Sequence, residues 1–136
     1  MKRDKQAAPK LPLEYKLLIR PKYKEIERKT VIEFGLRTVN EFTNFKYEIN
    51  VEQEQTDKTL RLIIRGLRAP KTSIPSIGPA VFFSEYENLS GNYNVIISKH
   101  GKDENQFLVE IAEKAITVKR RPKKKFIDIT TDETSW

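Results

Sequence analysis

Apolar and polar side chains alternate one by one along much of this 136-residue chain, and this pattern constrains its fold more than any other feature. On a β-strand, successive side chains point to opposite faces, so alternation gives one dry face and one wet face. The cleanest example is residues 45–52, in which Phe45, Tyr47, Ile49 and Val51 take every second position. Several such segments in series predict stacked antiparallel sheets. We therefore expect an all-β protein, an antiparallel β-sandwich of about seven to nine strands.

The segments between the expected strands carry turn-forming or strand-ending residues. Pro21 ends the first strand or places it at the edge of a sheet, because proline cannot donate a hydrogen bond to a neighbouring strand. Residues 22–29 are highly charged and predict a turn or a single helical turn. The expected strands span residues 13–19, 30–37, 45–52, 59–65, 80–86, 92–98, 106–111 and 116–119, with a further short strand at 126–129.

Residues 106–119 fit two structures. The apolar residues from Phe107 to Ala115 have the spacing of an amphipathic helix, and the Ala, Glu and Lys around them favour one. The polar turn before residue 106 and the β-branched run at 116–118 favour strands instead. We therefore predict a hairpin followed by another strand, with the helix as the alternative.

The chain is expected to form one domain with basic, flexible ends. Residues 1–12 predict a flexible basic arm, residues 13–118 the β-sandwich, and residues 119–136 a basic run and polar tail with room for one short edge strand. No apolar run is long enough to cross a bilayer, and no secretory signal follows the first residues. We expect a cytoplasmic protein, or a nuclear one if the source is eukaryotic.

One segment resembles known β-sandwich modules. Within residues 83–101, Phe83 is followed by Leu89, Gly91, Tyr93 and Val95 at alternating positions, and a glycine closes the next turn. This is similar to a segment of prealbumin-like and carboxypeptidase-regulatory modules, and to the tyrosine corner of immunoglobulin-like domains. The resemblance implies a sandwich without catalytic activity, in which the Tyr93 hydroxyl bonds to the preceding loop.

Positive charge is concentrated at the ends of the sequence. The chain has 26 Lys and Arg against 19 Asp and Glu, a formal charge of +7. Residues 114–125 hold seven basic and no acidic side chains, whereas residues 30–113 hold nine basic and twelve acidic ones. The body is therefore expected to be mildly acidic, with cations on its flanks. This asymmetry is the main functional clue in the sequence.

The basic run of residues 119–125 is the first candidate binding site. It resembles a nuclear-import signal, and it suits a nucleic acid or an anionic lipid surface. A solvated linker, or a charged edge that prevents aggregation, is the alternative. Residues 66–79 contain three prolines and two glycines, which is typical of a binding loop or a crossover between sheets. The candidate binding residues are Lys2, Arg3, Lys5, Arg68, Lys71, Lys119, Arg120, Arg121, Lys123, Lys124 and Lys125.

The sequence predicts no catalytic, metal or cofactor site. There is no cysteine and a single histidine, His100, which is expected to lie in a solvated turn. No phosphate-binding glycine loop, nucleophile motif or paired-histidine motif is present. We therefore expect no enzymatic activity, no cofactor and no small-molecule substrate. Trp136 is expected either to anchor in a partner's pocket or to be disordered.

These observations favour a non-catalytic interaction or assembly module, an accessory subunit of a larger complex with a protein partner. The alternative is an RNA- or DNA-binding protein that uses its basic terminal arms. An anionic membrane surface is a further possible partner of the same cations. A small-ligand or sugar-binding module, with Tyr86, Tyr93 or Trp136 as a platform, rests only on fold analogy.

Overall fold

The structure is a computed structural model that describes residues 13–69, 74–100 and 102–136. The predicted arm of residues 1–12 and the candidate Lys71 lie outside these ranges. The described residues contain no α-helix, and a single 3-10 turn, η1, spans Glu133–Ser135. The strands are β1 (Tyr15–Lys24), β2 (Lys29–Phe42), β3 (Glu48–Thr56), β4 (Thr59–Arg68), β5 (Gly78–Tyr86), β6 (Gly91–Lys99), β7 (Asp103–Ile111), β8 (Ile116–Arg120) and β9 (Ile127–Thr130).

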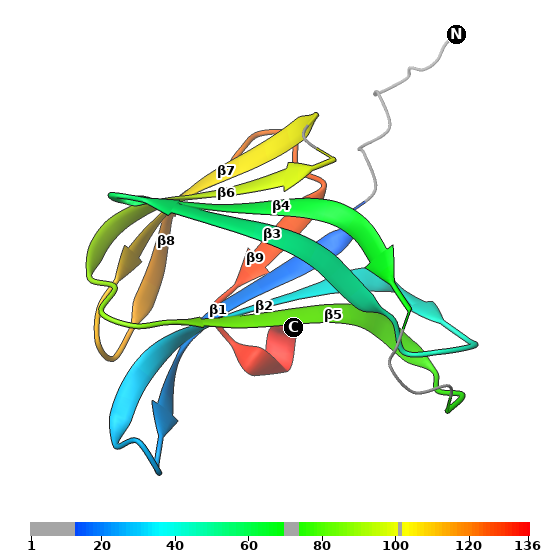
Figure 1. The fold of residues 1–136 in the computed structure, drawn as a ribbon. Helices are drawn as coiled ribbons and strands as arrows, with labels where there is room; N and C mark the ends of the chain where they lie inside the picture. Colours follow the sequence, from blue (N-terminus) through cyan, green and yellow to red (C-terminus); the bar gives the residue numbers. More distant parts are fainter. Residues whose placement is uncertain (1–12, 70–73, 101) are drawn as a thin grey trace, which may run out of the picture.

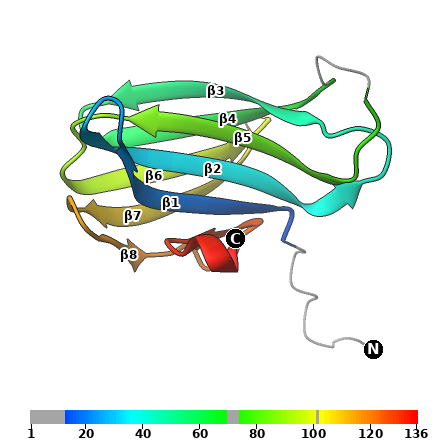
Figure 2. The ribbon, with the colours of Figure 1, turned by 90° about the horizontal axis from the view of Figure 1, so that it is seen from below.

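The nine strands form one mixed sheet that curls into a half-barrel (Figures 1 and 2). Their order is β8-β7-β6-β4-β3-β5-β2-β1-β9. The all-β prediction is confirmed. The purely antiparallel pairing is wrong, because β1 with β9, β3 with β5, and β4 with β6 are parallel. Alternation specifies which face of a strand is buried, but it carries no information about the neighbour or its direction.

Residues 106–119, for which the sequence allowed either a helix or strands, lie in β7, β8 and the turn between them. β7 pairs with β6 over nine residue pairs and then turns into β8. Phe107, Val109 and Ile111 point into the core, with at most 2% of their surface exposed. The helix alternative is therefore wrong, since the helical spacing of these side chains is overridden by their pairing with β6.

Pro21 lies inside β1 rather than after it, and β1 continues to Lys24 in a hairpin with β2. The other neighbour of β1 is β9, which pairs only with Tyr15 to Leu18. Beyond Leu18 that side of β1 is an edge, so the missing N–H of proline is tolerated there. The turn expected over residues 22–29 is confined to the hairpin loop between Lys24 and Lys29.

The core lies inside the curled sheet and is built from every second residue of its strands. Phe34 and Leu36 on β2, Leu62 on β4 and Phe107 on β7 are fully buried members of one continuous cluster. Tyr93 belongs to the same cluster and is 4% exposed. Among the described residues the Tyr93 hydroxyl has no hydrogen-bond partner, so the bond expected of a tyrosine corner is not formed. The Lys58 ammonium lies 4.6 Å from the centroid of the Tyr93 ring.

The sheet is only weakly continuous between β3 and β5. These strands share one residue pair, Glu48 with Val81, and then diverge (Figure 1). Farther along, the side-chain oxygen of Gln53 accepts hydrogen bonds of 2.6 Å from the hydroxyls of Ser84 and Tyr86. A side chain thus spans the place where the main-chain ladder is missing.

Residues 119–136 pack against the rest of the sheet and include the short edge strand β9. Lys119 and Arg120 lie in β8, residues 127–130 form β9 beside β1, and residues 131–136 fold against the outer face of the sheet. No break in the fold occurs at residue 118. The basic run is therefore a crossover between the two edge strands of the half-barrel.

Candidate functional site

The segment between β8 and β9, residues 121–126, is held to the sheet by one buried side chain. Asn105 on β7 is 3% exposed. Its side-chain oxygen accepts hydrogen bonds from the main-chain nitrogens of Phe126 at 2.9 Å and Ile127 at 3.3 Å. Its amide nitrogen donates to the main-chain oxygen of Lys124 at 3.0 Å. Asn105 therefore holds the end of the basic run, at Lys124, against β7.

The start of the described chain is bound to the same segment. The main-chain oxygen of Phe126 accepts hydrogen bonds from the nitrogens of Glu14 at 2.7 Å and Tyr15 at 3.2 Å. Lys99 bridges this junction, because its ammonium donates to the Glu14 carboxylate and lies 5.0 Å from the Phe126 ring centroid. The hydrogen bond to Glu14 raises the pKa of Lys99 above its usual range.

The cations of the run differ in their partners. Lys119 lies 3.7 Å from Glu110, and Lys125 lies 3.1 Å from Asp128. The other four are exposed, and no carboxylate of the described residues lies within 4 Å of them. We call these four, together with the main chain that carries them, the cationic connection: Arg120, Arg121, Lys123 and Lys124.

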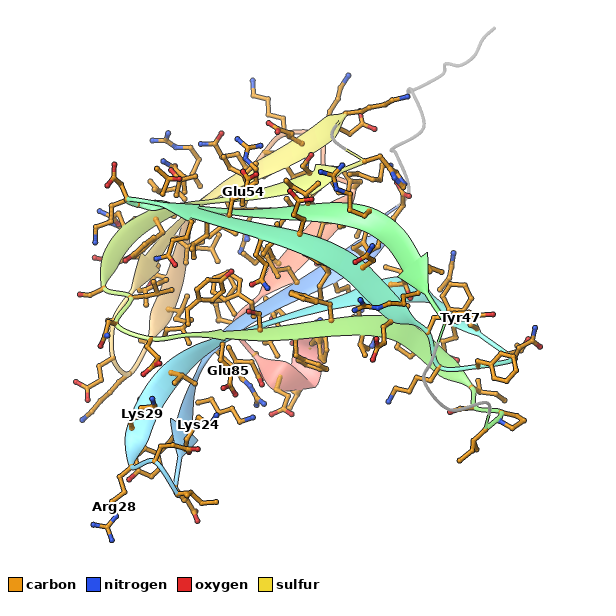
Figure 3. All side chains as sticks on the ribbon, in the orientation of Figure 1. Lys24, Arg28, Lys29, Tyr47, Glu54 and Glu85 are labelled. Carbon is orange, nitrogen blue, oxygen red and sulfur yellow. The ribbon has the colours of Figure 1, made fainter. Side chains whose placement is uncertain are left out.

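Elsewhere on the surface several cations lie close to carboxylates; Figure 3 labels Lys24, Lys29, Glu54 and Glu85, which take part in such pairs. Lys24 lies 2.7 Å from Glu85, and Glu54 lies 3.8 Å from Arg61. The predicted candidate Arg68 lies 3.3 Å from Glu48 at the end of β4, two strands away from β7 in the sheet order. It is therefore not part of the cationic connection. Lys2, Arg3, Lys5 and Lys71 lie outside the described residues.

The expected binding loop leaves β4 and enters β5, and its described ends expose apolar side chains. Ile74 and Ile77 are each 71% exposed, and Leu67 is 46% exposed. The main-chain nitrogen of Ser76 donates to the oxygen of Asn44 in the β2–β3 loop at 3.1 Å. This loop is therefore a second exposed surface, separate from the cationic connection.

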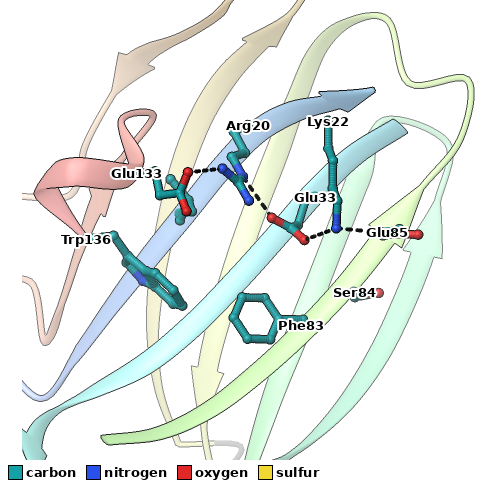
Figure 4. Close-up of a pocket in the computed structure, with 9 residues that line it drawn as sticks. Arg20, Lys22, Glu33, Phe83, Ser84, Glu85, Glu133 and Trp136 are labelled. Carbon is teal, nitrogen blue, oxygen red and sulfur yellow. Dashed lines mark hydrogen bonds and ion pairs between the residues drawn. The ribbon is translucent and has the colours of Figure 1, made fainter. Parts of the chain in front are cut away.

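Sequence reasoning did not anticipate a groove on the outer face of β1, β2 and β5 (Figure 4). Its volume is about 620 Å³. A chain of charges runs along it, in which the buried Glu33 accepts from Arg20 at 2.8 Å and lies 3.4 Å from Lys22. Arg20 also bonds to Glu133, and its pKa is raised, first of all by its hydrogen bond to Glu33.

Trp136 lies in this groove and is neither disordered nor projecting toward a partner. Its ring meets Phe83 edge to face, with centroids 5.4 Å apart, and its indole nitrogen donates to the main-chain oxygen of Lys16 at 3.1 Å. The one sequence feature that could have indicated this contact is Gly35, since a glycine inside a strand often marks the close approach of another group. We call this region the outer-face groove; it is lined by Leu18, Arg20, Lys22, Glu33, Phe83, Ser84, Glu85, Glu133 and Trp136.

The described residues contain no group of three or more His, Cys, Asp or Glu side chains that could hold a metal ion. His100 is exposed in the β6–β7 turn with a φ of 53°, and its main-chain nitrogen donates to Ile64. In the same part of the chain, no helix is long and apolar enough to span a membrane.

No protein-family model matches the sequence, and no curated protein or solved structure was found to be similar to the chain.

Proposed function

We propose that this chain is a non-catalytic interaction module, an accessory subunit that binds an acidic surface of a protein partner through the cationic connection. The observation that carries the proposal is the fixed position of these cations. The main-chain oxygen of Lys124 accepts from Asn105, and the neighbouring Phe126 is bound both to Asn105 and to the start of β1. The four cations have no carboxylate within 4 Å among the described residues. Because this segment is already ordered, a partner does not have to order its main chain on binding.

In this proposal the curled sheet serves as a sandwich-like scaffold. The single residue pair between β3 and β5 lets the sheet bend sharply there, so that its two halves can face each other as layers around one core. Such a scaffold leaves the chain segments between strands free to carry the binding residues.

The small extent of the positive surface favours a protein partner. Neighbouring surfaces carry paired charges, as in the contacts of Arg61 with Glu54 and Glu104. The aromatic ring that follows the connection, Phe126, is 5% exposed and cannot stack on a base. A compact group of cations beside paired charges is complementary to an acidic patch of similar size.

A nucleic acid is the second candidate, and one observation favours it. Glu14, near the start of the described chain, is hydrogen-bonded to Phe126, so the sequence that contains Lys2, Arg3 and Lys5 joins the body beside the cationic connection. Cations from both parts of the sequence could then meet one phosphate backbone. Such binding weakens steeply with salt, with a log–log slope of about −0.9 for each phosphate contacted.

Co-purification from the source cell with matched variants tests the first candidate. The variant R121Q/K123Q/K124Q removes three cations of the connection, and the control R28Q/K46Q/K114Q removes three exposed cations located elsewhere. We expect the wild type and the control to retain a stoichiometric protein partner that the connection variant loses. Recovery of the wild type alone, or equal partner recovery with both variants, contradicts the proposal.

Filter binding separates the second candidate from the first. Duplex DNA and single-stranded RNA are offered to the same three proteins at about 50 mM salt, where phosphate contacts are strong. Retention that the connection variant loses and the control keeps supports nucleic acid binding. No retention of either nucleic acid by the wild type removes this candidate.

A further inference from the structure

The last described residues bind back onto the outer-face groove, which shares no residue with the cationic connection (Figure 4). After β9 the chain forms η1, whose first turn is capped by the Asp132 carboxylate at 3.1 Å from the nitrogen of Thr134. Glu133 then pairs with Arg20, and the Arg37 guanidinium donates to the main-chain oxygen of Trp136 at 2.8 Å. These contacts are made by side chains and by the main-chain oxygen of Trp136, and not by a strand ladder.

The groove has a floor shaped for an aromatic ring. Gly35, in the middle of β2, carries no side chain, and a methyl group there would lie 3.3 Å from the Trp136 ring and 3.0 Å from Phe83. Phe83 forms one wall and is 51% exposed despite its contact with Trp136. Leu18, which is 1% exposed, lines the same region.

We propose that the outer-face groove is a docking site for a protein segment that forms a short helical turn and carries a carboxylate three residues before an aromatic ring, and that residues 133–136 occupy it as an internal ligand. The structure contains a partner for each recognition element. Arg20 receives the carboxylate, the floor at Gly35 and the wall of Phe83 receive the ring, and the main-chain oxygen of Lys16 receives a ring N–H.

The internal ligand is suited to exchange. η1 contains no buried residue, and the Glu133 side chain is 64% exposed. The groove also continues past the ring to Lys22, Ser84 and Glu85, so a longer segment from a partner would gain contacts that residues 133–136 do not make. Against this, the internal segment acts at an effective concentration on the order of millimolar, which a partner must overcome.

The first test offers the free segment to a chain whose own ring is removed. The probe is the peptide Thr-Asp-Glu-Thr-Ser-Trp, the sequence of residues 131–136, labelled with fluorescein at its amino end. Fluorescence anisotropy should rise to saturation with W136A, with a Kd of about 0.1 mM, roughly a tenth of the effective concentration of the internal segment. The wild-type chain should bind the probe about tenfold more weakly, because its own segment competes.

Double variants identify the residues that bind the probe. W136A/R20Q should lose about tenfold in affinity for the probe, because a charge-assisted hydrogen bond to the carboxylate is removed. A probe with Gln in place of Glu should lose as much, and combining the two changes should lose no more. The control W136A/I26A, altered at a side chain that is 93% exposed on the β1–β2 hairpin, should bind as W136A does. No saturable binding to folded W136A, or equal binding by W136A/R20Q, overturns the proposal.

A measurement on the unaltered chain covers the case in which W136A does not fold. Trp136 is the only tryptophan, so its emission reports this groove directly. An unlabelled peptide Thr-Asp-Glu-Thr-Ser-Phe should displace it and shift the emission to the red as the indole enters water. No shift at several times the effective concentration overturns the proposal. So does concentration-dependent dimer formation that requires Trp136, because a second copy would then be the occupant.

Discussion

Asn105 and Phe126 join two distant strands of the half-barrel, since the side-chain oxygen of Asn105 on β7 accepts a 2.9 Å hydrogen bond from the Phe126 nitrogen just before β9. The Phe126 oxygen in turn accepts from Glu14 and Tyr15 at the start of β1. Phe126 thus connects β7 to the start of β1 across the opening between the edge strands β8 and β9. The cationic connection owes its fixed position to this contact.

Replacing Asn105 with alanine should destabilise the fold by about 2–4 kcal/mol, because two buried N–H groups lose their acceptor. Urea denaturation measures the free energy of unfolding. The control is Q106A, whose exposed neighbouring side chain bonds only to Asn94 at 3.2 Å among the described residues, and its effect should stay within about 0.5 kcal/mol. Equal stability of N105A and Q106A would contradict the role of this contact.

Replacing Gly35 with alanine should destabilise the protein by about 1–3 kcal/mol, because the methyl group would crowd Phe83 and Trp136. The matched control is G78A, where an added methyl group meets nothing within 4 Å. That variant should be neutral or slightly stabilising, since alanine reduces the freedom of the unfolded chain. Thermal denaturation and the emission of Trp136 report the two effects, and adding F83A to G35A should recover part of the loss. An unchanged emission maximum in G35A would refute the close contact.

Local pattern predicted much of this fold. The strand expected at residues 59–65 lies within β4, and Leu60, Leu62 and Ile64 are fully buried as alternation requires. The parallel neighbour of β4 was not predictable, because Leu60 pairs with Val95, far away in the sequence. Nothing in the alternation of either segment specifies the other.

The candidate sites were predictable to different degrees. The run of cations is visible in the sequence, but the residue that holds it is not, since Asn105 looks like any polar residue beside a turn. Its one signal is its position in phase with Phe107 and Val109, on the buried face of β7. Similarly, Glu33 follows an exposed-face pattern, and its burial depends on its contacts with Arg20 and Lys22 of β1, which alternation alone does not indicate.

Arg20 should matter more for stability than Lys22, although both face Glu33. Arg20 donates to the buried carboxylate at 2.8 Å, whereas Lys22 lies at 3.4 Å with a more exposed side chain. We expect R20M to lower the free energy of unfolding by about 1–3 kcal/mol and K22M by less than about 1 kcal/mol. Urea denaturation of both variants measures these two changes, and a larger effect of K22M than of R20M would contradict the prediction.

Stability should fall as the pH rises above about 10, the pKa of tyrosine in an unfolded chain. Burial raises the pKa of Tyr15 and of Tyr86, so the folded protein keeps these phenolic protons to a higher pH than the unfolded chain does. Their contribution is therefore fully present below about pH 10 and is lost as the pH rises through the folded pKa. Lys99, whose pKa is raised by its hydrogen bond to Glu14, acts in the same direction.

The variant Y86F tests this pH dependence, with unfolding free energies measured between about pH 8 and pH 11.5. At pH 8 it should be less stable than the wild type by about 0.5–1.5 kcal/mol, because the hydrogen bond from the Tyr86 hydroxyl to Gln53 is lost. Above pH 10 its stability should fall less steeply, because one phenol with a raised pKa is absent. Tyr15 and Lys99 should still make the free energy of unfolding decrease with pH. A Y86F curve parallel to the wild-type curve would contradict the assignment, because it would mean that Tyr86 releases its proton at the same pH in both states.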